Sequence, residues 1–495
     1  MSTATKQQDS VPAPHHGLGG LHGVDEFRRV DVVVVGSGVS GSAAAMTAAR
    51  RGAKVALLEK QAAFGGSAAL SAGMFWTAPS VDAYRRRIPL GNVELGSRLV
   101  GDYAEALAEL RAAGVWVAEE PKRDVMTFGI GYSTDIHGIL AWCRDQVLAA
   151  GGETTAGAVV TELTRNGGTV TGVLVRTADG RRVRYEAGAV VLASGGFQGD
   201  RAELTRSIGP NADRLVLRSN PGSVGDGLRL AREAGSGGTT AMSTFYGHLL
   251  PYPVRNFETA HYLPYSQYYS GSTVLVNLQG RRFADETDGD ELLNQAVTFQ
   301  PQARGILIFD EFVRSTEVLE EPFPGLGSID RLGIAIEAGG QHAVAKTLPE
   351  LVDMVAGWGV DRGQLAHTLD RYAELAGHGG GTADGVPVSA SARAPQDGPF
   401  YALMVQPSIT FTFGGIRTNA RGEALDDDGV AVPGLFAAGA DIGGLSNYGY
   451  AGGLAPGYIT GRWAGTSAAD RAAAFVRNES GVVVAYQPGS ERNAQ

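Results

Sequence analysis

Blocks of apolar residues alternate along the chain with segments that have a helical pattern. The runs Val32 to Val35 and Val55 to Leu58 are apolar at every position, which indicates strands buried on both faces of a sheet. An alanine-rich segment from about residue 40 to 51 lies between them and predicts a helix. Because similar apolar runs return at 189–193 and 432–438, we predict an α/β fold built on a parallel sheet.

Three further runs, at 159–163, 170–176 and 181–185, are separated by Asn-Gly and Asp-Gly turns and predict a β-meander. From about Tyr246 the composition shifts towards tyrosine, and a linker rich in Gly, Ala, Ser and Pro covers 377–395. These changes predict a second unit inserted into the first. Helices are predicted at 93–113, 136–150, 348–357, 361–375 and 454–473.

Three glycines connect the first strand to the first helix. They are Gly36, Gly38 and Gly41, and Glu59 ends the second strand. The first glycine permits a tight turn, the second lets backbone amides approach a pyrophosphate, and the third lets helix and strand pack closely. An acid at the position of Glu59 accepts hydrogen bonds from ribose hydroxyls, so the motif predicts FAD or NAD rather than NADP. A glycine-rich turn without a ligand is the alternative.

The composition of the chain limits the classes of partner that the protein can bind. The chain has 52 acidic and 42 basic residues, a net charge of -10, which argues against nucleic acid or an anionic membrane as the main partner. Its single cysteine, Cys143, excludes an internal disulfide and a cysteine-based metal cluster, and we expect no metal site. No apolar run reaches the roughly 18 residues of a membrane span, so we expect a cytoplasmic protein without one.

The stretch from Phe64 to Trp76 has small and hydroxyl residues followed by a bulky apolar cluster. It resembles the FAD-binding loop of the fumarate reductase/succinate dehydrogenase flavoprotein superfamily, and its ending, Ser-Ala-Gly-Met-Phe-Trp, is most similar to the 3-ketosteroid dehydrogenase branch. The resemblance implies a Rossmann-like FAD-binding domain with an inserted α+β cap domain. Members with covalent flavin carry a histidine in this loop, where this chain has Ser67 and Ala68, so we expect non-covalent FAD.

The resemblance also implies domain bounds and cofactor contacts. We expect a tail at 1–24, the FAD-binding domain at 25–245 and 395–478, the cap at 246–394, and a tail at 479–495. Asp226 is a candidate helix N-cap, Asp441 would meet the ribityl chain, and the helix after Gly453 would point at the flavin pyrimidine ring. The expected cofactor-binding residues are Gly36, Ser37, Gly38, Val39, Ser40, Gly41, Glu59, Lys60, Gly65, Gly66, Ser67, Ser71, Ala72, Gly73, Val160, Ala193, Ser194, Gly195, Asp226, Gly439, Ala440, Asp441, Gly453 and Leu454.

The substrate positions depart from those of the fumarate reductases. Their arginine after the Arg-Phe-x-x-Glu segment is missing from 282–290, their His-Thr-x-Gly-Gly motif begins here with Phe411, and their clamping arginine is replaced by Tyr450. A dicarboxylate would lose its bidentate partners, which disfavours fumarate and succinate. A tyrosine at the position of Tyr450 resembles the ketosteroid dehydrogenases, where it serves proton transfer or carbonyl polarisation.

We therefore predict a flavin-dependent dehydrogenase that forms or reduces a C=C bond beside a carbonyl. The predicted substrate is a neutral, apolar ketone, steroid-like or polyketide-like. An external electron acceptor, which the sequence does not identify, would reoxidise the flavin. Tyr450 is the main catalytic candidate, with packing against the flavin as its alternative role. The weaker candidates are Tyr448, Tyr132, Tyr268, Tyr262 and Tyr265. The alternatives are a dicarboxylate or tricarballylate-type dehydrogenase, an ene-reductase, a flavin monooxygenase and a non-catalytic FAD-bound protein.

Overall fold

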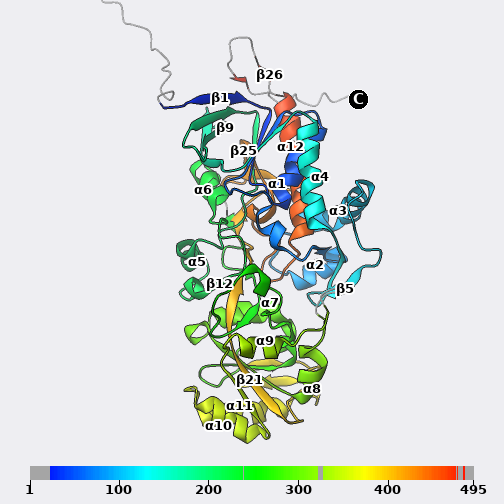
Figure 1. Ribbon diagram of the computed structural model, residues 1–495, viewed down its shortest axis with the longest axis vertical. Coiled ribbons are helices and arrows are strands. Elements are labelled where there is room, and N and C mark those ends of the chain that lie inside the picture. Colours follow the sequence, from blue (N-terminus) through cyan, green and yellow to red (C-terminus); the bar gives the residue numbers. More distant parts are fainter. Residues whose placement is uncertain (1–22, 238, 322–326, 475, 478–482, 485–495) are drawn as a thin grey trace, which may run out of the picture.

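The computed structural model describes residues 23–474, except 238 and 322–326, together with 476–477 and 483–484. The predicted tails at 1–24 and 479–495 lie almost entirely outside these residues. Figure 1 shows an elongated molecule in which a lobe of sheets and helices lies above a second, smaller lobe.

A six-stranded sheet organises the upper lobe, and its order is β24–β25–β11–β2–β3–β7. The three central strands, β11, β2 and β3, are parallel to one another and buried at every position. Only the edge strand β24 is antiparallel to its neighbour. The predicted α/β fold with a parallel sheet is confirmed. The strands are β24 (Glu423–Leu425), β25 (Ala431–Ala437), β11 (Ala189–Leu192), β2 (Val32–Val35), β3 (Val55–Leu58) and β7 (Glu153–Thr155).

Two helices cross at short distance beside this sheet, as Figure 1 shows for α1 (Val39–Arg50) and α12 (Leu454–Ala474). A Cβ built on Gly461 would lie only 2.3 Å from the backbone oxygen of Ser40. Small residues on both helices therefore allow the backbones to approach closely, which explains the alanine-rich sequence of α1. A third helix, α4 (Ile136–Ala149), packs against α1 on its other side.

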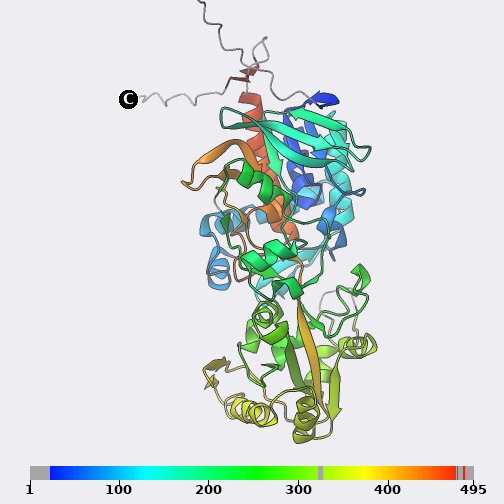
Figure 2. The same ribbon diagram turned by 90° about the vertical axis from the view of Figure 1, so that its left-hand side faces the viewer.

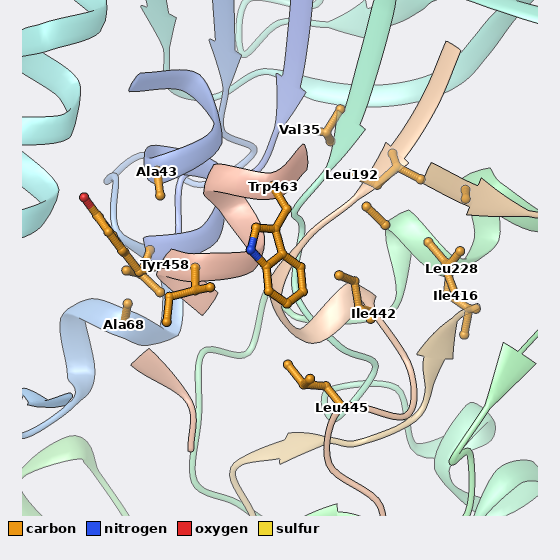
Figure 3. Close-up of a cluster of buried hydrophobic side chains, with 14 of the residues drawn as sticks. Val35, Ala43, Ala68, Leu192, Leu228, Ile416, Ile442, Leu445, Tyr458 and Trp463 are labelled. Carbon is orange, nitrogen blue, oxygen red and sulfur yellow. The ribbon is translucent and has the colours of Figure 1, made fainter. Parts of the chain in front are cut away.

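Aromatic side chains of α12 complete the core below the sheet (Figure 3). Tyr458 and Trp463 are buried together with Val35 of β2 and with Ile442, which lies between β25 and α12 in the chain. Their polar atoms are satisfied, because the Tyr458 hydroxyl donates to a carboxylate oxygen of Glu109 at 2.8 Å and the Trp463 indole donates to another acid of α3. The core thus fixes α12 against α3 (Val93–Ala112) as well as against the sheet.

The predicted β-meander is confirmed as β8 (Val159–Asn166), β9 (Thr169–Arg176) and β10 (Arg182–Glu186). These strands are antiparallel, and β1 (Glu26–Arg29) adds to β10 in parallel. The meander forms a separate sheet at the top of the molecule in Figure 1.

The lower lobe is built around β21 (Phe400–Ile409), the long strand near the centre of this lobe in Figure 2. It pairs antiparallel with β17 (Gly305–Asp310) and β15 (Leu249–Pro251). β21 falls in the segment that the sequence assigned to the second part of the FAD-binding domain. Strand pairing therefore favours a return to that domain near residue 410, and the exact bounds stay a prediction.

No helix of the described residues is both long and apolar enough to cross a membrane. The remaining elements complete the sheet of β21, pair in small sheets of their own or lie around the sheets. They include β4 (Met74–Thr77), α2 (Val81–Arg87), β5 (Lys122–Val125), β6 (Gly129–Ser133), α5 (Arg201–Ser207), β12 (Val216–Leu217), α6 (Asp226–Glu233), β13 (Thr239–Thr240), β14 (Phe245–Tyr246), β16 (Val274–Asn277), α7 (Asp290–Thr298), α8 (Glu311–Val313), α9 (Arg331–Glu337), β18 (His342–Ala345), α10 (Leu348–Ala356), α11 (Arg362–Ala373), β19 (Gly381–Ala383), β20 (Val386–Val388), β22 (Phe411–Thr412), β23 (Gly415–Ile416), β26 (Val476–Arg477) and β27 (Val483–Val484).

Candidate active site

A cavity of about 310 Å³ runs from the turn between β2 and α1 to a group of aromatic side chains. The end at this turn is lined mainly by backbone atoms, because Gly36, Gly38 and Gly66 have no side chains. Its other end is walled by the rings of Tyr246 and Tyr450. The volume falls within the range of small-molecule sites.

All but four of the residues that the sequence assigned to the cofactor line this cavity. The exceptions are Gly41, Gly65, Gly73 and Asp441. The lining residues of that set are Gly36, Ser37, Gly38, Val39, Ser40, Glu59, Lys60, Gly66, Ser67, Ser71, Ala72, Val160, Ala193, Ser194, Gly195, Asp226, Gly439, Ala440, Gly453 and Leu454.

Close backbone approach explains two of the exceptions. A Cβ built on Gly41 would lie 1.8 Å from the backbone oxygen of Gly36, so the third glycine of the motif allows helix and strand to pack, as predicted. A Cβ on Gly73 would lie 2.2 Å from the backbone oxygen of Thr134. Both glycines therefore permit the packing around the cavity without lining it.

Glu59 is buried in the cavity wall and oriented by the glycine loop. One carboxylate oxygen accepts hydrogen bonds from the backbone N–H of Ser37 at 3.0 Å and from its hydroxyl at 2.7 Å. The other oxygen accepts from the backbone N–H of Gln61 at 2.8 Å. A carboxylate has about four lone-pair sites, so Glu59 can still accept from ribose hydroxyls. Together with the bare glycine backbone, this arrangement fits the adenosine half of FAD.

Two acids differ from their expected roles. Gly225, not Asp226, is the N-cap of α6, and the Asp226 carboxylate instead pairs with Lys60 at 2.5 Å. Asp441 does not line the cavity, because its carboxylate accepts from the backbone N–H of Ser194 at 2.5 Å and of Gly195 at 3.2 Å. Burial raises the pKa of Asp441 to about 7. Asp441 therefore joins two cofactor-binding segments, and the expected contact with the ribityl chain has no support.

Tyr450 lies at the centre of the aromatic end. Its ring stacks on Tyr246 with centroids 4.0 Å apart and meets the edge of Trp76 at 5.0 Å. A Cβ built on Gly453 would lie 3.0 Å from the Tyr450 hydroxyl, so this hydroxyl is placed at the N-terminal end of α12. Burial raises the pKa of Tyr450, which keeps the phenol neutral and able to donate a hydrogen bond.

A hydroxyl, an imidazole and a carboxylate form a buried line behind Tyr450. The Tyr246 hydroxyl lies 2.7 Å from Nε2 of His248, and Nδ1 of His248 contacts the Asp290 carboxylate. Burial lowers the pKa of His248 and raises that of Tyr246, so both groups are neutral in the resting site. Sequence reasoning missed this line, because His248 lies in the connection after β14 and Asp290 follows it by 42 positions.

The structure also places a cation on the aromatic wall. Arg218 follows β12 directly and lines the same cavity as Tyr246 and Tyr450. An arginine from elsewhere in the chain therefore lies where the sequence predicts a site for a neutral ketone. Arg218 was missed because it comes from neither of the segments that supply arginines to the fumarate reductases.

The other tyrosine candidates divide into two groups. Tyr268 and Tyr262 line the cavity, whereas Tyr265, Tyr132 and Tyr448 do not. The Tyr132 ring lies under the guanidinium of Arg111, and Tyr448 is 43% exposed. The positions of Tyr132 and Tyr448 give no support to a catalytic role.

Known proteins share this architecture. A family model described as FAD binding domain matches residues 31–87 and 109–454. Fumarate reductase (cytochrome) of Shewanella frigidimarina is 29% identical over 474 residues, covering 89% of this chain and 77% of the relative. The 4-oxocyclohexanecarboxylate 2-dehydrogenase of Sinomonas cyclohexanicum is 26% identical over 556 residues, covering 90% of this chain and 94% of the relative.

A solved structure agrees with the fold. The crystal structure of 3-ketosteroid-Δ4-(5α)-dehydrogenase from Rhodococcus jostii RHA1 with 4-androstene-3,17-dione has a TM-score of 0.71 at 22% identity, covering 91% of this chain and 98% of that one. At this identity the likeness shows the fold, and the assignment to the ketosteroid branch stays a prediction. The chain belongs to the FAD binding domain family, within the fumarate reductase/succinate dehydrogenase flavoprotein superfamily, and is an FAD-dependent oxidoreductase.

Proposed function

We propose that this oxidoreductase forms or reduces a C=C bond next to the carbonyl of a ring-bearing, largely apolar substrate. FAD, when bound, supplies the acceptor or donor of the hydride. The observation that carries the proposal is the stacked pair of Tyr450 and Tyr246 at one end of a cavity whose other end is the dinucleotide loop. Stacked rings favour a flat, apolar substrate over a small dicarboxylate.

Tyr450 is suited to polarise the substrate carbonyl. Because burial raises its pKa, its hydroxyl stays protonated and donates a hydrogen bond to an oxygen that gains negative charge during the reaction. The same rise in pKa makes Tyr450 a poor base. We therefore assign it the donor role among the two roles that the sequence left open.

Tyr246 is the better candidate for proton transfer. In the oxidation direction its oxygen takes the proton from the carbon next to the carbonyl, while its own proton passes to Nε2 of His248. The carboxylate of Asp290 then stabilises the imidazolium that results. In the reduction direction the same two protons move back. This line gives a buried tyrosine the basicity that an isolated phenol lacks.

The test is anaerobic mixing of the FAD-loaded protein with cyclic ketones and, after reduction by dithionite, with the matching enones. We expect loss of oxidised flavin absorbance with a ketone, or its recovery with an enone. A flavin that dithionite reduces but that no ketone, enone or dicarboxylate changes would contradict the proposal and support a non-catalytic FAD protein. Rapid flavin reduction by NAD(P)H would instead support a monooxygenase.

Release of the flavin tests the cofactor linkage separately. No histidine lines the cavity in the described part of the chain, and Ser67 stands at the position expected for a covalent link. We propose that FAD is held without a covalent bond, so acid precipitation of the protein should leave the flavin in solution. Flavin that stays with the precipitate would show a covalent link.

A further inference from the structure

We propose that Arg218 binds a carboxylate of the substrate, so that the substrate is a ring-bearing keto acid or the corresponding unsaturated acid. This inference rests on the proposed function, because it concerns the substrate of the same site. It replaces the neutral ketone that the sequence predicts with a molecule that carries one negative charge beside an apolar ring.

Arg218 is 7% exposed, and the protein uses only part of its hydrogen-bonding capacity. Its Nε donates to the backbone oxygen of Tyr262 at 3.1 Å, and Nη1 donates to the hydroxyl of Thr410 at 3.1 Å. A guanidinium has five N–H groups in a fork that matches a carboxylate. These two bonds hold the fork in place and leave N–H groups for a ligand.

No Asp or Glu carboxylate of the described residues lies within ion-pair distance of Arg218. The two acids that line the cavity, Glu59 and Asp226, are engaged with Ser37 and Lys60 at the dinucleotide end. A buried cation without an anionic partner is costly, which favours a ligand that brings the negative charge. Another buried arginine, Arg282, does have its carboxylate within the chain.

The position of Arg218 relative to the proton-transfer groups defines the kind of acid. Arg218 donates to the hydroxyl of Thr410, and the ring of the next residue, Phe411, has its centroid 5.7 Å from that of Tyr246 and 5.6 Å from that of Tyr450. Arg218 is therefore anchored at the aromatic end of the cavity. The other cation in the lining, Lys60, pairs with Asp226 at the opposite end. One available cation beside stacked rings fits a monocarboxylate with a ring better than it fits a dicarboxylate, which needs two clamps.

The test compares binding of benzoate and benzamide, two flat rings that differ in charge, to the FAD-loaded protein by changes in the flavin absorbance. We expect benzoate to bind roughly 10- to 100-fold more tightly, because charge-assisted hydrogen bonds to a buried guanidinium are strong. Arg218→Gln should remove this preference. Arg229→Gln should keep it, because Arg229 is exposed and paired with Glu233 on α6.

A second variant keeps the test decisive where Arg218→Gln does not fold or does not retain FAD. Arg218→Lys keeps the charge but loses the fork, so we expect benzoate to bind more weakly than in the parent protein and still more tightly than benzamide. Equal binding of benzoate and benzamide to the parent protein would overturn the inference, as would a benzoate preference that survives in Arg218→Gln.

Failure of the proposed function would give a different result from failure of the inference about Arg218. Binding is measured here without turnover, so a benzoate preference in a protein that oxidises and reduces no substrate would contradict only the proposed function. Equal turnover of a ketone and its carboxylated analogue, without any benzoate preference, would contradict only the role of Arg218.

Discussion

At the residue scale, the site depends on which hydroxyl can lose its proton. Tyr246 and Tyr450 are stacked and both buried, yet only Tyr246 contacts an imidazole, that of His248. Burial alone raises the pKa of a phenol, so two similar tyrosines in one pocket would both be donors. The hydrogen-bonded line from Tyr246 through His248 to Asp290 makes the two tyrosines different, because His248 can accept the proton of Tyr246.

Tyr246→Phe tests this difference. The variant keeps the ring that stacks on Tyr450 but loses the proton-transfer oxygen, so we expect flavin reduction by substrate to slow by roughly 100-fold or more. Rapid-mixing absorbance measures this rate. Tyr132→Phe is the matched control, because Tyr132 lies outside the cavity, and its rate should equal that of the parent protein. A normal rate in Tyr246→Phe would remove this residue from the mechanism.

Tyr450→Phe tests the donor role. Loss of one hydrogen-bond donor to a developing oxyanion lowers a rate by about 100- to 1000-fold, and we expect a decrease of this order in turnover. Tyr448→Phe serves as control because this side chain is 43% exposed and does not line the cavity. Near-normal turnover of Tyr450→Phe would leave Tyr450 only its packing against the flavin.

At the element scale, the contact between α1 and α12 supports the dinucleotide loop. Gly461→Ala would place a methyl group against the backbone of Ser40, so the two helices would have to separate. We expect a loss of about 1–3 kcal/mol in the free energy of unfolding, measured by denaturant titration. Gly101→Ala is the control, because nothing lies within 4 Å of a Cβ built at this α3 position, and it should raise stability slightly. Equal stability of both variants would contradict the close packing.

The first turn of α7 carries a buried acid that gives a pH-dependent stability. Burial raises the pKa of Glu291 from 4.5 to about 8, so the folded state binds this proton more tightly than the unfolded state. Its stabilising contribution is therefore present below pH 4.5 and is lost as the pH rises towards 8. We expect the melting temperature to fall over this range in the parent protein.

Glu291→Gln should show a shallower fall in melting temperature over the same range, because glutamine does not titrate. Glu94→Gln, at an exposed position in the first turn of α3, should follow the parent protein. The same slope in Glu291→Gln and the parent protein would show that other groups cause the pH dependence.

At the scale of the whole molecule, the sequence predicts the upper lobe well. The buried runs at β2, β3 and β11 are local patterns, and so are the glycine spacing and Glu59. In the lower lobe the helices α10 and α11 were predicted, but the sheet was not. Strand β21 pairs with β15, β17 and β18, which come from separate parts of the chain, and its own pattern does not identify these partners.

The aromatic end of the site shows the same limit. Tyr450 was predicted from its place in a motif, whereas Tyr246, His248 and Asp290 meet only after the chain folds. Arg218 reaches the cavity from a short strand, β12, that pairs with β21. Residues of a site that come from different elements carry no common spacing in the sequence, so pattern reasoning could not join them.

The mechanism requires that a hydride pass between the flavin and the substrate carbon one position further from the carbonyl than the carbon that Tyr246 deprotonates, at a site that ends at the wall of Tyr246 and Tyr450. The most direct measurement is the flavin absorbance during anaerobic mixing with a cyclic keto acid, in the parent protein and in Tyr246→Phe. We expect rapid loss of oxidised flavin in the parent protein and a large delay in the variant. An equally fast change in both proteins, or no change in the parent protein with any ketone or enone, would contradict it.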